Sequence, residues 1–362
     1  MLDEKPEKIL IIRLSAIGDV IHTLPVAYAL RQKFPNAQID WLVEDKAFPL
    51  VNMNPYLDDV IILPRKTWKK EVKEEGIIKT IKSFWKFFKK MRKRNYNINL
   101  DLHGLFKSAF SSFMIKPNLR MGPADGRELS NWFYQAKIEL KENNLHKVDR
   151  NLQLAEALGV NSEIVNYGLK ITPVIKSRVN RLFEMENIKS DKKLVIINPF
   201  TTWESKNWFL ERYFELADKL IEEGYYIIFT GSNADREPIN RYQGNEEYYT
   251  NLAGKTDLEG LTEVYNRADL YIGGDTGPTH LAAAIGLKVV ALMGPTAPET
   301  HGPYGKGHTV IQDNSLECIR CWDKECSRNM QCMKSISVAQ VLRITKKKLN
   351  QIQQEDGING EN

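Results

Sequence analysis

The sequence lacks several features that would assign it to a familiar class of protein. Its 362 residues contain no apolar stretch near the roughly 20 residues that a membrane-spanning helix needs. The first segment, MLDEKPEKIL, is acidic and polar where a secretory signal would be basic and then apolar. All four cysteines fall between positions 318 and 332. These absences predict a cytoplasmic protein that does not rely on disulfides.

Two motifs of nucleotide-binding enzymes are also absent. The turn after the first expected strand lacks G-x-G-x-x-G, which disfavours a nicotinamide or flavin dehydrogenase. No Asp-x-Asp pair occurs, although many sugar transferases use one to hold a divalent metal against a diphosphate. A bound diphosphate would then be neutralised by a helix dipole, lysine and hydroxyl groups. We therefore expect no cofactor and no catalytic metal.

The pattern that is present is an alternation of strands and helices. Strand-length apolar runs such as KILIIRL in the first half and LVIINP in the second are each followed by a helical pattern. A polar stretch at 172–193 separates the halves, which predicts an α/β chain with domains at 1–175 and 190–335. Each domain should be a Rossmann-like parallel sheet that binds ligands at the carboxyl ends of its strands. The linker would leave those ends facing one another across a cleft.

Positive charge is concentrated in one segment. The net charge is +5, but between Arg65 and Arg94 thirteen Lys and Arg face only three Asp and Glu. Apolar residues at 77–91 recur at helical spacing, and lysines fill the other face. Such an imbalance attracts anionic surfaces, so nucleic acid, phosphorylated lipid and anionic membrane are candidate partners. The alternative is a helix packed on the first sheet with a solvated lysine face.

The cysteines follow the spacing C-x2-C-x4-C-x5-C at Cys318, Cys321, Cys326 and Cys332. In a cytoplasmic protein such clustering suits a compact structural zinc site. The alternative is a loop packed by reduced thiols.

The sharpest motif runs from Gly273 to His280 (GGDTGPTH), after one expected strand and before a helix. A helix that starts there presents free N–H groups and the positive end of its dipole, which bind phosphate. Asp275 stands where an N-cap is expected. Thr276, Gly277 and His280 would face a phosphate or ribose. The alternative is a capped, buried helix without a ligand.

Two further segments follow strands in the second half. After the strand at 194–199, Thr201, Thr202 and Lys206 could hold a diphosphate and offset the charge of a leaving group. After the strand at 225–230, Asp235 could accept hydrogen bonds from ribose hydroxyls. The alternatives are a solvated surface loop and an aspartate that caps the next helix.

In the first half, Asp19 lies in the turn SAIGD after the first strand. A carboxylate at that edge could take a proton from an attacking hydroxyl. The alternative role for this aspartate is an N-cap.

At these motifs the chain resembles the bacterial lipopolysaccharide heptosyltransferases of glycosyltransferase family 9, nearly from end to end. In the first half the resemblance is carried by SAIGDVIHTLP, QIDWLVED, LDLHGLFKSA, GRELSNWFY and HKVDRNLQLAEALG. In the second half it is carried by TTWESKNW, GGDTGPTHLAAAIG and MGPTAPETHGPYG. The first-half motifs look most like the heptosyltransferase I branch, whereas the cysteine cluster departs from its enterobacterial members.

The resemblance implies a GT-B fold and an inverting, metal-independent transfer of heptose from ADP-L-glycero-β-D-manno-heptose to the Kdo sugar of lipid A. Asp19 would be the general base. Lys206, Thr201 and Thr202 would hold the diphosphate and heptose, Asp235 the ribose, and Thr276, Gly277 and His280 the phosphate and heptose. Asp275 would organise the helix start and touch the donor sugar. The acceptor side would comprise Arg65, Lys66, Lys69 and Arg127.

The same resemblance implies an enzyme of the cytoplasm, peripheral on the inner face of the inner membrane, with an anionic leaflet rather than nucleic acid as partner. A helix at about 338–351 is expected to pack back on the first domain. The alternatives are a family 9 transferase that adds a later heptose or another sugar, and a nucleotide-sugar epimerase or hydrolase on the same scaffold.

Overall fold

The computed structural model describes residues 5–142, 144–189 and 191–360. The chain divides into two compact units, Met1–Lys170 and Ile171–Asn362, each of which is treated by itself below. Among the helices that the structure describes, none has both the length and the apolar content required to cross a bilayer.

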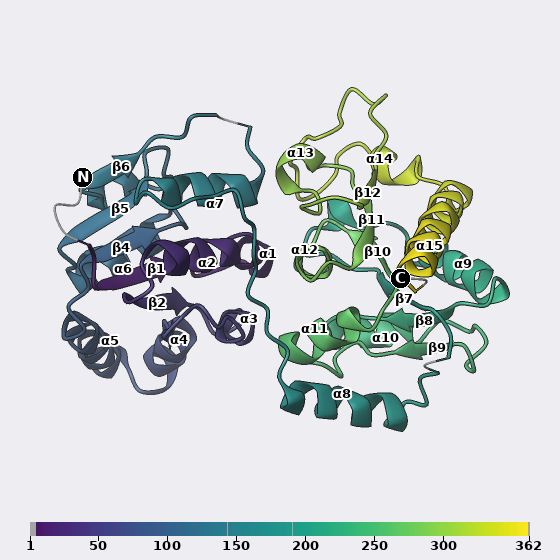
Figure 1. Ribbon diagram of the computed structural model, residues 1–362, viewed down its shortest axis with the longest axis horizontal. Helices are drawn as coiled ribbons and strands as arrows, with labels where there is room; N and C mark the ends of the chain where they lie inside the picture. Colours follow the sequence, from purple (N-terminus) through teal and green to yellow (C-terminus); the bar gives the residue numbers. More distant parts are fainter. Residues whose placement is uncertain (1–4, 143, 190, 361–362) are drawn as a thin grey trace. The chain divides into compact units, whose positions relative to one another are not determined.

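The first unit is built on a six-stranded parallel sheet in the order β3-β2-β1-β4-β5-β6 (Figure 1). Its strands are short, and those in the middle are buried on both faces, which explains their nearly continuous apolar sequence. The strands are β1 (Lys8–Ile12), β2 (Gln38–Val43), β3 (Asp59–Ile62), β4 (Ile98–Asp101), β5 (Leu119–Pro123) and β6 (Ala136–Ile138).

Helices cover both faces of this sheet (Figure 1). On one face, α4, α5 and α6 enclose a core in which Phe88 and Met91 pack with Leu10 and Leu42. Elsewhere α2 packs against α7. The helices are α1 (Ile17–Ile21), α2 (Leu24–Lys33), α3 (Phe48–Asn52), α4 (Arg65–Glu74), α5 (Ile77–Arg92), α6 (Phe106–Ile115) and α7 (Lys147–Glu156), with a 3-10 turn η1 (Ser130–Phe133).

The second unit repeats the same strand order on a second parallel sheet, β12-β11-β10-β7-β8-β9. In both sheets the order reverses next to the first strand, between β1 and β4 and between β7 and β10. The strands are β7 (Leu194–Asn198), β8 (Tyr226–Phe229), β9 (Tyr249–Asn251), β10 (Leu270–Gly274), β11 (Lys288–Leu292) and β12 (Thr309–Ile311). Two Rossmann-like sheets in one α/β chain confirm the predicted fold class.

The helices of the second unit include one that corrects a prediction. The predicted helix at 338–351 is α15, and it packs against α9, with Val341 and Leu349 buried in the second core. It therefore belongs to the second unit and not to the first, because its apolar stripe is used up there. The helices are α8 (Pro173–Met185), α9 (Leu210–Glu222), α10 (Arg236–Ile239), α11 (Leu258–Asn266), α12 (Gly277–Ala284), α13 (Pro298–His301), α14 (Gln331–Lys334) and α15 (Val338–Gly360), with 3-10 turns η2 (Glu204–Lys206) and η3 (Asn233–Asp235).

The polar stretch expected to be a linker contains α8. Thr172 caps this helix by accepting a hydrogen bond from the backbone N–H of Ile175, and Pro173 occupies its first turn. Ile175, Val179 and Phe183 form a narrow buried stripe, and α8 packs against α11. The many charged residues on its other faces explain why the sequence pattern resembles a linker.

Candidate active site

The predicted residues of the second unit lie where its strand order reverses. β7 is followed by the loop that carries Thr201 and Lys206, and β10 is followed directly by Asp275. Open α/β sheets bind ligands at such a reversal, because the connections leave the two strands in opposite directions and open a crevice.

Gly274 allows these two segments to touch. A Cβ at this position would lie 2.8 Å from Cγ2 of Thr201 and 3.1 Å from the backbone oxygen of Lys206, so any side chain would displace the loop. Asn207 closes the loop at its other end. Its Oδ1 accepts hydrogen bonds from the backbone N (2.8 Å) and Oγ1 (3.0 Å) of Thr201. Asn207 was not predicted, because a single amide in a polar loop carries no distinctive signal.

Asp275 is the centre of this site. Its Oδ2 lies 2.6 Å from Nζ of Lys206 and accepts a hydrogen bond of 2.7 Å from Oγ1 of Thr296. Its Oδ1 lies 3.2 Å from Nε2 of His280. The side chains of Asp275 and His280 are each only 6% exposed, and that of Lys206 is 11% exposed. A buried carboxylate thus holds a lysine and a histidine at the start of α12.

Charge keeps this carboxylate ionised. Burial alone would raise the pKa of Asp275, but the hydrogen bond and charge of His280 and the charge of Lys206 hold its pKa well below the usual value. Lys206 also lies 4.1 Å from the ring centroid of Trp203, a cation–π contact that fixes its ammonium group from a second side.

The predicted N-cap role of Asp275 is wrong. Thr276 is the N-cap of α12, with Gly277 and Pro278 in the first turn. Asp275 precedes the cap because its two oxygens are taken by Lys206, Thr296 and His280.

The remaining predicted donor residues lie at the same edge of the sheet. Thr202 is exposed beside Thr201. Asp235 follows β8, the neighbour of β7, and its Oδ2 accepts hydrogen bonds from the backbone N (2.6 Å) and Oγ (2.7 Å) of Ser232. These bonds close the capping box of η3, whereas the Asp235 side chain makes no capping hydrogen bond to the next helix, α10. Because β8 and β10 flank β7, their ends are about 10 Å apart, a span that a nucleotide can bridge.

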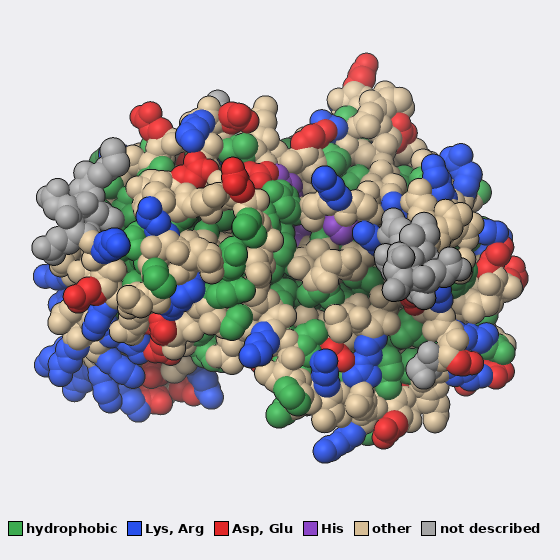
Figure 2. Space-filling view, viewed as in Figure 1, with side chains coloured by type: hydrophobic (Ala, Val, Ile, Leu, Met, Phe, Trp, Pro, Cys, Tyr) green, Lys and Arg blue, Asp and Glu red, His purple; other side chains and the backbone are tan. Residues whose placement is uncertain are grey.

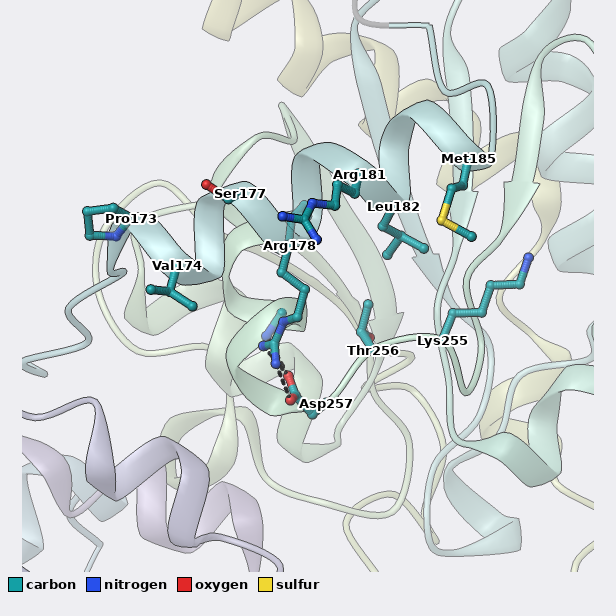
Figure 3. A pocket seen from close by; sticks show the side chains of 12 residues that line it. Pro173, Val174, Ser177, Arg178, Arg181, Leu182, Met185, Lys255, Thr256 and Asp257 are labelled. Atoms are coloured by element: carbon teal, nitrogen blue, oxygen red, sulfur yellow. Dashed lines mark hydrogen bonds and ion pairs between the residues drawn. The ribbon is translucent and has the colours of Figure 1, made fainter.

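A cavity of about 830 Å³ in this unit lies elsewhere, between α8 and the segment that leads into α11 (Figure 3). Arg178 projects from α8 and makes two hydrogen bonds of 2.8 Å to the carboxylate of Asp257. Among the described residues that line this cavity, none is a predicted donor residue.

The site of the first unit is organised around Asp19 in α1, at the carboxyl end of β1. Its Oδ2 forms a 2.9 Å ion pair with Arg13, and the side chain remains 38% exposed. Burial of the group would raise its pKa, but the charge of Arg13 and the backbone N–H of Ala16 lower it. Asp19 is therefore charged at neutral pH.

His103 lies at the end of β4, the other strand at this reversal. The buried carboxylate of Asp101 fixes the turn, since it accepts hydrogen bonds from the backbone N of His103 (2.8 Å) and the hydroxyl of Tyr134 (2.8 Å). Burial, together with the charges of Arg13 and Lys107, lowers the pKa of His103 to about 2. Within the described residues, neither ring nitrogen has a hydrogen-bond partner. A neutral imidazole thus stands in the field of Asp19.

Cations surround these two groups. Lys107 donates a hydrogen bond of 2.8 Å to Oγ of Ser15. Burial and the charge of Arg150 lower the pKa of Lys147. The charge of Asp19 raises this pKa, whereas the charges of Arg13 and Arg127 lower it further. Of this group, only Arg127 was predicted from the sequence. Arg13 directly follows β1, and Lys107 lies in the first turn of α6, the helix after β4; these positions at the ends of the two strands were the signal that could have found them.

The other predicted acceptor residues lie on α4. Arg65 forms a 2.5 Å ion pair with Glu44, which lies 3.4 Å from Lys107, so the start of α4 is connected to the Asp19 region. Lys66 and Lys69 are exposed on the same helix. Their part in acceptor binding stays a prediction.

The structure bears on the two alternatives for the cysteines. In the described part of the chain, no three His, Cys, Asp or Glu side chains are placed to hold a metal ion, which favours the alternative, a loop packed by reduced thiols. Cys332 is 8% exposed and packs in the second core, whereas Cys321 is exposed to solvent. Burial raises the pKa of the Cys332 thiol to about 11. The other three thiols are close enough to Cys332 to contribute to this raised pKa.

Comparison with known proteins agrees with this arrangement. The model of glycosyltransferase family 9 (heptosyltransferase) matches residues 84–331. The chain is 28% identical to lipopolysaccharide heptosyltransferase 1 of Pseudomonas aeruginosa over 88% of this chain and 87% of that protein. It is 26% identical to lipopolysaccharide heptosyltransferase 3 of Escherichia coli K12, over 77% of this chain and 80% of that protein.

A solved structure shares the fold. The heptosyltransferase WaaC of E. coli, with ADP-2-deoxy-2-fluoro heptose, superposes with a TM-score of 0.73 at 23% identity, covering 94% of this chain and 99% of that one. The likeness confirms the predicted GT-B fold class. Since the family model covers more than half of the sequence, the chain belongs to glycosyltransferase family 9, the heptosyltransferases.

Proposed function

We propose that this glycosyltransferase transfers heptose from ADP-L-glycero-β-D-manno-heptose to the Kdo–lipid A inner core, with inversion and without a metal ion. One observation carries the proposal: a buried cluster of Lys206, Asp275 and His280 at the open end of a Rossmann-like sheet. Such a cluster fixes the Lys206 ammonium beside the start of α12, where the ammonium and the helix dipole together would stabilise a diphosphate. That WaaC was solved with an ADP-heptose analogue supports the choice of donor.

On the donor side, Lys206 and the first turn of α12 meet the negative charge that grows on ADP as it leaves. Thr201, Thr202, Thr276, Gly277 and His280 contact the diphosphate and the heptose, and Asp235 contacts the ribose. Asp275 positions Lys206 and His280 and borders the sugar. Because these groups are held before the donor binds, they do not need to reorganise during the reaction.

On the acceptor side, Asp19 removes the proton from the acceptor hydroxyl as its oxygen attacks the anomeric carbon. ADP departs from the opposite face of the sugar, which inverts the configuration. The carboxylate is ionised at neutral pH and is more than one-third exposed, so a hydroxyl can approach it. The cations Arg65, Lys66, Lys69 and Arg127 would bind the carboxylates and phosphates of the acceptor.

An acceptor of this kind is anchored in a bilayer by its acyl chains. The enzyme would therefore work from the cytoplasm as a peripheral protein on the inner face of the inner membrane. We propose an anionic lipid leaflet, and not nucleic acid, as the surface on which it acts.

Mass spectrometry of the reaction product tests the proposal. The chain is incubated with ADP-heptose, UDP-sugars or GDP-sugars and a panel of glycolipids truncated at successive core sugars. We expect a mass increase of one heptose on Kdo–lipid A, with ADP-heptose only. If heptose is added only to an acceptor that already carries heptose, the enzyme acts at a later step of core synthesis. Free heptose released without any acceptor would replace transfer by hydrolysis.

A further inference from the structure

The hairpin formed by α4 and α5 exposes more apolar surface than its packing requires. Ile77 is 65% exposed, Ile78 70%, Ile81 49% and Trp85 51%, while Val72 on α4 is 47% exposed. All five lie in one stretch of 14 residues at and near the tip of the hairpin. A cluster of exposed apolar side chains of this size on a folded unit marks a surface with a partner.

This exposed stripe is distinct from the buried face of α5. At about 100° per residue, Phe84, Phe88 and Met91 point in one direction, and these residues contact the first core. Ile78, Ile81 and Trp85 point about a quarter-turn away, in a second stripe that the sheet does not cover. The apolar arc of α5 is thus about twice as wide as the core can bury.

Lysines border the exposed stripe. On the helix, Lys82, Lys86 and Lys89 follow it on the side away from the core, and all three are exposed. Between Arg65 and Arg94 the excess of positive charge is ten, from thirteen basic and three acidic residues. Figure 2 shows this concentration of Lys and Arg on the part of the first unit that carries α4 and α5. Apolar side chains beside lysines are the signature of a helix that lies in the interface of an anionic bilayer.

The tip of the hairpin lies toward the carboxyl edge of the sheet, the edge that also carries Asp19. Arg94, just after α5, is ion-paired to Asp40 (2.8 Å) and Asp59 (2.6 Å), which lie toward the amino ends of β2 and β3. α5 therefore runs toward the amino edge, and its first residues lie toward the carboxyl edge. From Ile77 to Met91 the helix rises about 21 Å, longer than the strands it covers. The tip thus reaches past the edge where Asp19 and His103 lie.

We infer that the tip of the α4–α5 hairpin is a membrane-docking surface, in which Ile77, Ile78, Ile81 and Trp85 enter the interface of an anionic bilayer while the flanking lysines bind its headgroups. The inference deepens the proposed function, because docking at this tip would bring a lipid-linked acceptor toward the carboxyl edge that carries Asp19. Nucleic acid fits the lysines but gives no reason for exposed isoleucines.

Vesicle co-sedimentation of the full chain tests the inference. The vesicles contain phosphatidylethanolamine with phosphatidylglycerol, or phosphatidylcholine alone as the neutral arm. We expect binding to the anionic vesicles that weakens with salt. The triple variant Ile78→Ser, Ile81→Ser, Trp85→Ser should bind them about tenfold more weakly or worse. The triple variant Lys82→Gln, Lys86→Gln, Lys89→Gln should also lose at least about tenfold.

The matched control is Val174→Ser with Met185→Ser on α8, two residues that are 77% and 78% exposed. It removes exposed apolar surface from the second unit and should bind vesicles within about twofold of the unchanged chain. The thermal midpoint of every variant is measured so that loss of fold is not read as loss of docking. The apolar triple variant should still glycosylate a soluble acceptor lacking acyl chains, but should lose transfer to an acceptor embedded in vesicles.

Anionic-vesicle binding unchanged in the folded apolar triple variant would overturn the inference. So would absence of vesicle binding by the unchanged chain together with salt-sensitive binding to single-stranded RNA. The vesicle assay contains no donor sugar, so failure of heptose transfer on every acceptor would overturn the proposed function without altering the docking result.

Discussion

Asp19 and Asp275 both lie at the reversal of strand order in their own sheets, yet their surroundings differ. Each follows a strand that borders the reversal of its sheet, β1 in the first unit and β10 in the second. The side chain of Asp19 is 38% exposed and has one ion pair, with Arg13. The side chain of Asp275 is 6% exposed and contacts Lys206, Thr296 and His280.

This difference separates an aspartate that can react from one that holds other groups in place. The described contacts of Asp19 fall on Oδ2, so its other face is open to an incoming hydroxyl. Both oxygens of Asp275 are engaged by other side chains, so this carboxylate is placed to organise charge and not to remove a proton. The lesson is that a carboxylate after a strand is assigned a role by its partners and its exposure, and not by its place in the topology.

The change expected to have the largest effect is Asp19→Asn. The amide keeps the shape but cannot accept the proton, so kcat should fall by about a thousandfold while the affinity for ADP-heptose changes little. Steady-state kinetics and calorimetry of donor binding measure the two quantities. Glu163→Gln, which neutralises an exposed carboxylate in the same unit, is the control. Near-normal turnover in Asp19→Asn would remove the residue from the mechanism.

The change Asp275→Asn should mainly lower the stability of the protein, because Asp275 holds other groups in place and does not transfer a proton. It leaves the nearly buried Lys206 ammonium without its counter-charge and should lower the free energy of unfolding by about 3 kcal/mol at neutral pH. Thr296→Val removes only one hydrogen bond to the same carboxylate and should cost about 1 kcal/mol. Urea unfolding followed by circular dichroism measures both variants.

The difference in stability between the unchanged chain and Asp275→Asn should depend on pH, with a sign set by the lowered pKa of Asp275. Because the folded-state pKa of Asp275 lies below 3.8, the ordinary value of an aspartate, its ionic contribution to stability is complete above that pH and is lost as the pH falls further. The gap between the unchanged chain and Asp275→Asn should therefore stay constant from neutral pH to about pH 5 and narrow in stronger acid. A gap that already closes near neutral pH would contradict the assignment of the lowered pKa.

The smallest effect is expected from His103→Gln. The folded state keeps His103 neutral, with its pKa lowered to about 2, whereas in the unfolded chain the imidazole takes up a proton near its ordinary pKa of 6.5. Stability is therefore lost as the pH falls below 6.5, by about 1 kcal/mol at pH 5.5, and the variant should not show this loss.

Unfolding at two pH values measures this effect, and the pH profile of kcat/KM supplies a second readout. The profile should have the same shape in both proteins above pH 5. A limb near pH 6.5 that disappears in His103→Gln would mean that the imidazole titrates during the reaction.

Much of the architecture was predictable because it depends on local periodicity. The helix expected at 77–91 is α5, and the strand expected at 97–102 (NINLDL) is β4, which spans Ile98–Asp101. β5 and β6 were not predicted, because they are short and carry polar residues such as Arg120 and Lys137 among few apolar ones. The motif residues Lys206, Asp275 and His280 were found in sequence, and the structure brings them together, whereas Asn207, Thr296 and His103 were not singled out.

The sequence by itself determined the period of its apolar residues, and with it two parallel sheets and polar motifs at the ends of particular strands. Only the tertiary structure decided that Asp275 is enclosed by Lys206 and His280, that Cys332 lies in a core, and that Ile78 and Trp85 remain exposed. The physical reason is the separation along the chain between the residues that interact. Backbone period is set by neighbours along the chain, whereas burial and charge are set by residues from distant segments that meet only after folding.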